Sequence, residues 1–166
     1  MNKYGLISLI LTCVLFFLQF IPLGVYFQFE NPFVNSHVRI PIQLFTFQDN
    51  ELFIWGMVTN GVFQNWFEVN ILTGIFFLVL LPLAGILTIF GFWKENKTGK
   101  KLMNVNFIFL LVILLYSIIG IPIYSEEILG VQFSYFDIFS HLNYGFFILI
   151  INLILALIAN IKHPIQ

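Results

Sequence analysis

The chain has 166 residues, of which 60% are apolar and only 9% are charged, and its mean hydropathy is +0.96. A soluble domain carries about 25% charged residues, so this composition excludes soluble enzyme folds and indicates a chain immersed in lipid. The modest glycine and proline content and the single cysteine, Cys13, exclude collagen-like, disordered and disulfide-bonded classes. With one arginine, Arg39, and no extended basic cluster, the sequence predicts no nucleic-acid partner.

Four apolar segments are long enough to cross the hydrocarbon core of a bilayer, which takes about 20 helical residues. They cover residues 5–26, 71–93, 102–123 and 142–161, and none contains Asp, Glu, Lys, Arg or His. Pro82 removes a backbone hydrogen bond within the second segment and is expected to bend it. We therefore predict an all-α membrane protein, a four-transmembrane-helix bundle that forms a single membrane domain over residues 1–166.

The charged residues divide unequally between the two ends of these spans. One side holds all six lysines, namely Lys3, Lys94, Lys97, Lys100, Lys101 and Lys162. The other side holds Arg39 and seven of the eight acidic residues, with Glu95 as the exception. Because Lys and Arg resist translocation, we predict a multi-pass protein with both termini cytoplasmic. The inner basic loop is then 94–101, and the outer segments are 27–70 and 124–141.

The first outer segment is too apolar for a flexible linker and is predicted to fold into strands. Three apolar runs, 40–47, 51–58 and 62–69, are separated by turn residues at Gln48-Asp49-Asn50 and at Thr59-Asn60-Gly61. Asn-Gly between such runs indicates a hairpin, because both central positions of a type I′ turn need positive φ. A further strand candidate, 131–136, lies in the second outer segment. Open sheet edges are costly in lipid, so we expect a small extracytoplasmic antiparallel β-sheet cap.

The aromatic side chains of this cap exceed what three or four strands can bury by themselves. They either pack onto the span ends and headgroups or form a partner-binding face, since exposed apolar patches mark interaction sites. Tryptophan is favoured at interface hot spots, and aromatic residues flank the predicted hairpin. On the second interpretation, the predicted contact residues are Phe53, Trp55, Phe63, Trp66 and Phe67.

The spans lack the charged residues that usually drive transport or catalysis within a membrane. Interhelical hydrogen bonding explains polar residues such as Gln19, Ser117 and Asn152, although they could also line a pore. On the outer side, the possible metal ligands His37, His141, Glu126, Glu127 and Asp137 show no characteristic spacing. We therefore predict no cofactor, no metal site and no enzymatic activity.

Four spans, two cytoplasmic termini and a strand-rich first outer segment resemble the claudin and peripheral-myelin-protein group of tetraspans. That group typically has a tryptophan soon after the first span, a Gly-Leu-Trp motif and a cysteine pair. Here Phe29-Glu30 stands near the first feature, Phe53-Ile54-Trp55 is a loose counterpart of the second, and the cysteine pair is absent. The resemblance implies a non-catalytic protein that associates laterally, or with a neighbouring cell, through its outer sheet.

We expect a structural, accessory or adhesion-type subunit that binds other integral membrane proteins, or itself, through its outer cap and its lipid-facing helices. Two alternatives of other classes stay open, an oligomeric channel or small-solute transporter and a membrane enzyme with an outer metal site. The basic loop could also attract anionic headgroups, although its role in setting orientation is enough to explain it.

Overall fold

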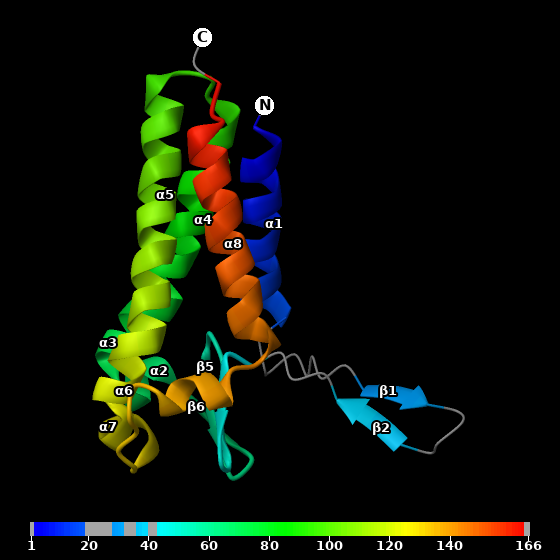
Figure 1. Ribbon diagram of the computed structural model, residues 1–166, viewed down its shortest axis with the longest axis vertical. Helices are drawn as coiled ribbons and strands as arrows, with labels where there is room; N and C mark the ends of the chain where they lie inside the picture. The colour runs from blue at the N-terminus through cyan, green and yellow to red at the C-terminus, as the bar shows by residue number, and fades with distance from the viewer. Residues whose placement is uncertain (1, 19–27, 32–35, 40–42, 165–166) are drawn as a thin grey trace.

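The computed structural model describes residues 2–18, 28–31, 36–39 and 43–164. Its main body is a bundle of four helices (Figure 1): α1 (Lys3–Leu18), α4 (Leu81–Trp93), α5 (Lys97–Leu115) and α8 (Tyr144–Ile161). Helix α1 packs against α4 and α8, and α5 packs against the same two helices, so the four close into a ring. The two ends of the chain lie at one end of the bundle, and the sheet described below lies at the other.

Three helical segments are long and apolar enough to cross a membrane, namely Ile71–Trp93, Lys97–Ile123 and Tyr144–Ile161. They coincide within five residues with the predicted segments 71–93, 102–123 and 142–161. Helix α1 is apolar but has 16 residues, fewer than the roughly 20 that a span requires. The remainder of the predicted first span, from residue 19 to 26, lies outside the described residues.

Two of the long helices contain a wide π-helical turn directly before a proline. The turn η2 (Ile75–Leu80) follows the short helix α3 (Ile71–Gly74) and precedes Leu81-Pro82. The turn η3 (Tyr116–Gly120) precedes Pro122 in the short helix α6 (Ile121–Ile123). Proline has no N–H and its ring collides with the carbonyl four residues earlier, so a wide turn lets the helix continue past it. At Pro82, where the sequence predicts a bend, the structure has the π-helical turn η2.

The described part of the segment between α1 and α4 contains two antiparallel sheets. One is a pair, β1 (Gln28–Asn31) and β2 (Ser36–Arg39), which the sequence did not predict. The other is the predicted cap, a meander of β3 (Phe45–Phe47), β4 (Asn50–Leu52), β5 (Gly56–Thr59) and β6 (Val62–Asn65). Asn60 and Gly61 have φ values of 51° and 79°, which confirms the predicted hairpin turn between β5 and β6.

Three details of the predicted cap are wrong: the single strand over 51–58, the end of the run 62–69, and the candidate strand 131–136. The run 51–58 is two strands rather than one, because the chain reverses between them and Leu52 pairs with Met57. The run 62–69 leaves the sheet after Asn65, whose side chain caps the helix α2 (Trp66–Val69) by accepting from the Phe67 amide, while Glu68 accepts from the Asn65 amide.

The candidate strand 131–136 is irregular and joins no sheet. It follows the helix α7 (Ser125–Leu129), and its Phe133 amide donates to Ser125 Oγ at 2.9 Å. The Ser134 amide donates to Asp137 Oδ2 at 3.0 Å, at the start of the 3-10 helix η4 (Asp137–His141). Local hydrogen bonds to side chains therefore replace those of a sheet ladder in this segment.

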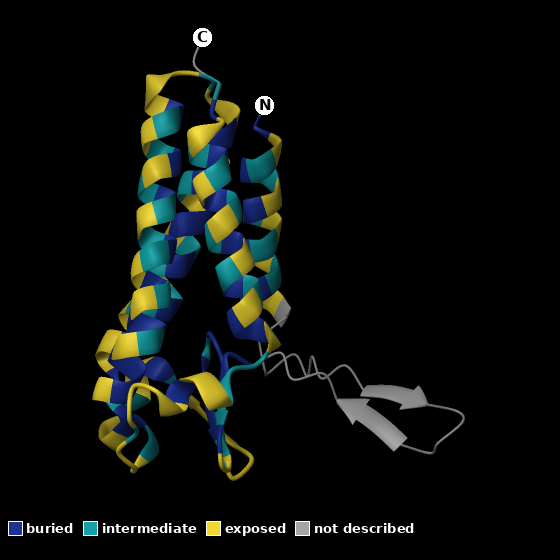
Figure 2. Ribbon diagram, in the orientation of Figure 1, coloured by how far each residue is buried: buried dark blue, intermediate teal, exposed yellow. Residues whose placement is uncertain are grey.

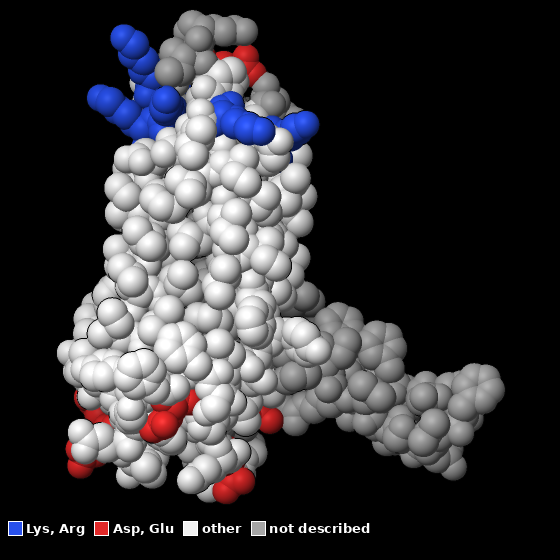
Figure 3. Space-filling view, in the orientation of Figure 1, with Lys and Arg blue, Asp and Glu red and all other residues white. Residues whose placement is uncertain are grey.

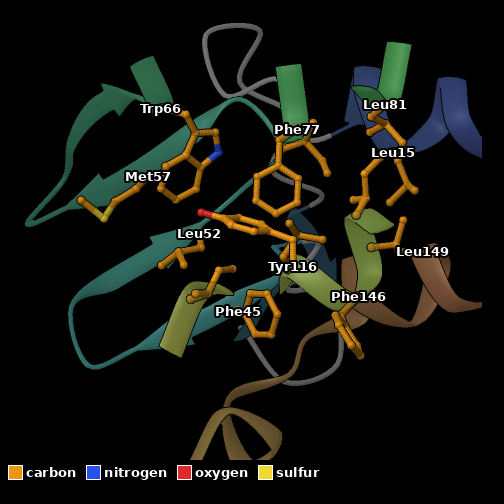
Figure 4. Close-up of a cluster of buried hydrophobic side chains, with 14 of the residues drawn as sticks. Leu15, Phe45, Leu52, Met57, Trp66, Phe77, Leu81, Tyr116, Phe146 and Leu149 are labelled. Carbon is orange, nitrogen blue, oxygen red and sulfur yellow. The ribbon is translucent and has the colours of Figure 1, made fainter. Parts of the chain in front are cut away.

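One buried apolar cluster continues from the bundle into the cap (Figure 2). Figure 4 shows Phe45, Leu52 and Met57 of the sheet gathered around Phe77 and Tyr116 of the helices. The Phe76 and Tyr116 rings stack at 4.1 Å between centroids, so the two π-helical turns touch beneath the sheet. Much of the aromatic content of the cap is therefore used to seal the end of the bundle.

Candidate functional site

The five predicted contact residues fall into two groups, of which the first is buried or half-buried. Phe53 and Trp66 are 2% and 0% exposed, and the Trp66 indole donates to the Phe53 carbonyl at 2.8 Å. Trp55 is half-buried, with its indole donating to the Phe16 carbonyl at 2.6 Å and its ring 4.2 Å from the Phe16 ring. Trp66 and Phe53 thus connect two parts of the cap, and Trp55 connects the cap to α1. A partner cannot bind Phe53 or Trp66 in this conformation.

The second group, Phe63 and Phe67, is exposed on the cap. Their exposed fractions are 36% and 47%, and the neighbouring Val62 and Ile71 reach 62% and 67%. We call these four residues along β6, α2 and α3 the β6 surface. The sequence prediction missed Val62 and Ile71. Val62 directly follows the turn residue Gly61, and Ile71 directly follows the cap residue Asn70.

The two edges of the cap sheet differ. The β3 edge is covered by the chain before α8, since Phe45 bridges Leu142 and Asn143 Nδ2 donates to Thr46 Oγ1 at 2.6 Å. The His141 ring also contacts this edge, with Nδ1 2.8 Å from the Thr46 carbonyl. At the opposite edge, β6 pairs with β5 and with no other strand of the described residues. An open edge offers free N–H and C=O groups to another chain.

Some of the polar residues in the bundle interior join two helices, and others bond within their own helix. Ser8 Oγ donates to Asn152 Oδ1 at 2.7 Å, and Asn152 Nδ2 donates to Thr12 Oγ1 at 2.8 Å, which ties α1 to α8. Ser117 Oγ donates to the Ile113 carbonyl of its own helix at 2.8 Å. Of the three predicted pore-lining candidates, Asn152 and Ser117 are thus buried and hydrogen-bonded, and Gln19 lies outside the described residues.

The histidine and carboxylates of the predicted outer segments do not converge in the described part of the chain, where no three potential metal ligands come together. The His141 ring lies against Phe47 in a tilted arrangement, with 4.6 Å between ring centroids, and Asp137 accepts from the Ser134 amide. Glu126 and Glu127 lie in the first turn of α7. The side chain of His37 lies outside the described residues. Asp137 and His141 are thus engaged in local hydrogen bonds and, for His141, a ring contact.

Charge is sorted along the long axis of the molecule. Figure 3 shows the lysines gathered at the end that carries both termini and most acidic side chains at the end that carries the cap. The chain matches no protein-family model, no curated protein and no solved structure. The resemblance to claudins and peripheral myelin proteins therefore stays a prediction.

Proposed function

We propose that this chain is a non-catalytic, four-span membrane protein with both termini in the cytoplasm, which associates with another integral membrane protein through β6. The main support is the contrast between the two sheet edges, because β3 is covered by the protein's own chain while β6 is open and apolar. The sorting of lysines and carboxylates supports the orientation. The apolar character of α1 supports a fourth span.

The backbone of β6 suits the addition of a partner strand. Thr59 and Val62 flank a two-residue turn and form a hydrogen-bonded pair, so the next pair, Val58 and Phe63, is a non-hydrogen-bonded one. The N–H and C=O of Phe63 therefore point away from β5, toward the open edge. Strand addition draws its affinity from such main-chain groups and its specificity from neighbouring side chains, which the β6 surface supplies.

Photo-crosslinking in native membranes tests this proposal. A photoreactive residue in place of Phe63 or Phe67 is expected to form a protein adduct, because a partner strand would lie within a few ångströms of it. The matched control is Phe136, which is 83% exposed on the segment that covers the other edge, and it is expected to form none. Mass spectrometry of the adduct distinguishes a second copy of this chain from a different membrane protein.

Two variants at one position separate the ring from the backbone. Phe63→Ala removes the ring alone, whereas Phe63→Pro also removes the outward N–H without breaking a bond to β5. A hydrogen bond to the partner contributes about 1 kcal/mol, so recovery of the partner should be about fivefold lower for the proline variant than for the alanine variant. Equal recovery of partner with both variants, or adducts from Phe136 alone, would overturn the proposal.

A further inference from the structure

A groove lies at the lysine-rich end of the bundle, between the first turns of α5 and the last turn of α8. Its volume is about 540 Å³, and its lining residues are Lys97, Lys100, Lys101, Asn104, Val105 and Asn160. Figure 3 shows the lysine side chains that project at this end of the molecule. Half of the lysines in the chain therefore surround one depression, with no carboxylate among its lining residues.

The floor of the groove holds an unused hydrogen-bond acceptor. Asn160 Nδ2 donates to Asn104 Oδ1 at 3.1 Å, which fixes the two amides across the α5–α8 contact. Asn160 Oδ1 is shielded from solvent and has no hydrogen-bond partner. A buried polar atom without a partner is costly and is usually satisfied by water or a ligand. Because Asn160 Oδ1 is shielded, a hydroxyl donor in the groove reaches it only when the Asn160 amide turns toward the groove. With that turn, the groove suits a molecule with both an anionic group and a hydroxyl donor.

Exposed apolar residues follow the lining residues of the groove along both helices, toward the middle of the bundle. On α5, Ile108 and Val112 follow Val105 at spacings of three and seven residues, and both are exposed. On α8, Leu157 and Ile154 precede Asn160 at spacings of three and six residues and are exposed as well. A molecule whose polar end occupied the groove would therefore lay an apolar chain along these two rows. A free phosphate ion would make no use of them.

We propose that this groove binds the headgroup of an anionic phospholipid that carries free hydroxyl groups, such as phosphatidylglycerol. The lysines bind the phosphate, and the acyl chains follow the exposed apolar residues of α5 and α8. The Asn160 amide turns toward the groove, so that the headgroup glycerol donates to its Oδ1. This site is independent of the partner-binding edge, which lies at the other end of the molecule.

Lipid retention in nanodiscs of mixed phosphatidylglycerol and phosphatidylcholine tests the site. The full-length protein is transferred to mild detergent, and native mass spectrometry counts the phosphatidylglycerol that stays bound. The triple variant Lys97→Gln, Lys100→Gln and Lys101→Gln is expected to retain at least about tenfold less, because each lysine near anionic lipid contributes about 1 kcal/mol. The matched control, Lys3→Gln, Lys94→Gln and Lys162→Gln, loses the same charge outside the groove and should retain most of its lipid.

Two single variants test the shape of the groove and its acceptor. Val105→Trp fills the groove with every lysine in place and is expected to lower phosphatidylglycerol retention at least about tenfold. Asn160→Leu removes the acceptor and is expected to reduce the preference for phosphatidylglycerol over phosphatidic acid by about fivefold, the value of one hydrogen bond.

Circular dichroism establishes that each variant is folded before its lipid content is compared. Equal lipid loss in the two lysine triples would show that total charge, not the groove, attracts the lipid, and would overturn the proposal. Unchanged retention in Val105→Trp would do the same. Displacement of the bound lipid by millimolar inorganic phosphate would identify a free anion as the natural occupant and would also overturn it.

Discussion

Asn106 is fully buried in α5, yet neither its amide nitrogen nor its amide oxygen has a hydrogen-bond partner. Asn152 in α8 is equally buried, but it accepts from Ser8 and donates to Thr12. The two asparagines thus share an amino-acid type and an apolar helical setting and differ in hydrogen bonding. A buried polar group without a partner costs about 1 to 3 kcal/mol, whereas a satisfied one stabilises its neighbours.

The same substitution at these two positions is expected to change stability in opposite directions. Asn106→Leu should raise the free energy of unfolding by about 1 kcal/mol, because it removes an unsatisfied group at similar volume. Asn152→Leu should lower it by about 0.6 to 2 kcal/mol, because it deprives two helices of an interhelical bond. Denaturant titration of the purified protein in mixed micelles measures both values. A comparable loss of stability in both variants would show that the Asn106 amide has a partner after all.

The exposure of individual aromatic residues could be predicted from the sequence only in part. Trp66 and Phe67 are adjacent in the run 62–69, and a strand there would place them on opposite faces without saying which of the two faces the core. The capping box formed by Asn65 and Glu68 starts a helix at Trp66, which turns that ring into the core and leaves Phe67 outside. The asparagine and glutamate three residues apart are the local signal that could have marked this boundary.

At the scale of the elements, hydrophobic length predicted the helices well, since an uninterrupted apolar run of span length has few other stable conformations in lipid. The π-helical turns η2 and η3 were not predictable in the same way. A proline indicates a disturbance but does not say whether the helix bends, breaks or widens. Here the wide turns bring Phe76 and Tyr116 into a stack under the cap, which is a tertiary contact that local sequence does not reveal.

The two wide turns also predict how the protein responds to proline substitutions. A proline in a regular helix costs about 3 kcal/mol, so its removal normally stabilises the protein by a similar amount. Because η2 already accommodates Pro82, Pro82→Ala is expected to change the free energy of unfolding by less than about 1 kcal/mol. Val112→Pro, in the regular part of α5, should cost about 3 kcal/mol or more. A gain of about 3 kcal/mol from Pro82→Ala would contradict this interpretation of the turn.

At the scale of the whole molecule, the sheet and the bundle share one core. The cluster that includes Leu15, Leu81 and Leu149 of the bundle also includes Phe45 and Met57 of the sheet. The cap is therefore part of the same folding unit as the helix ends. Of the two edge strands of the cap sheet β3–β6, β6 is the one with both an open backbone edge and exposed apolar side chains.

The sorting of charge between the two ends predicts the sidedness of the molecule, because lysine-rich connections stay in the cytoplasm. Starting from a cysteine-free Cys13→Ser chain, single cysteines at Lys97 and Lys162 should react with a membrane-impermeant maleimide only after the membrane is permeabilised. Single cysteines at Asp49 and Phe136, both in the outer segments, should react in intact cells. The asparagine of the sequon Asn96-Lys97-Thr98 should stay unmodified in a membrane that contains an N-glycosylating enzyme, because it lies in the same lysine-rich loop. Labelling of Lys162→Cys in intact cells would place the C-terminus outside. That result would require an odd number of spans or the opposite orientation. In the opposite orientation, β6 would face a different set of partners.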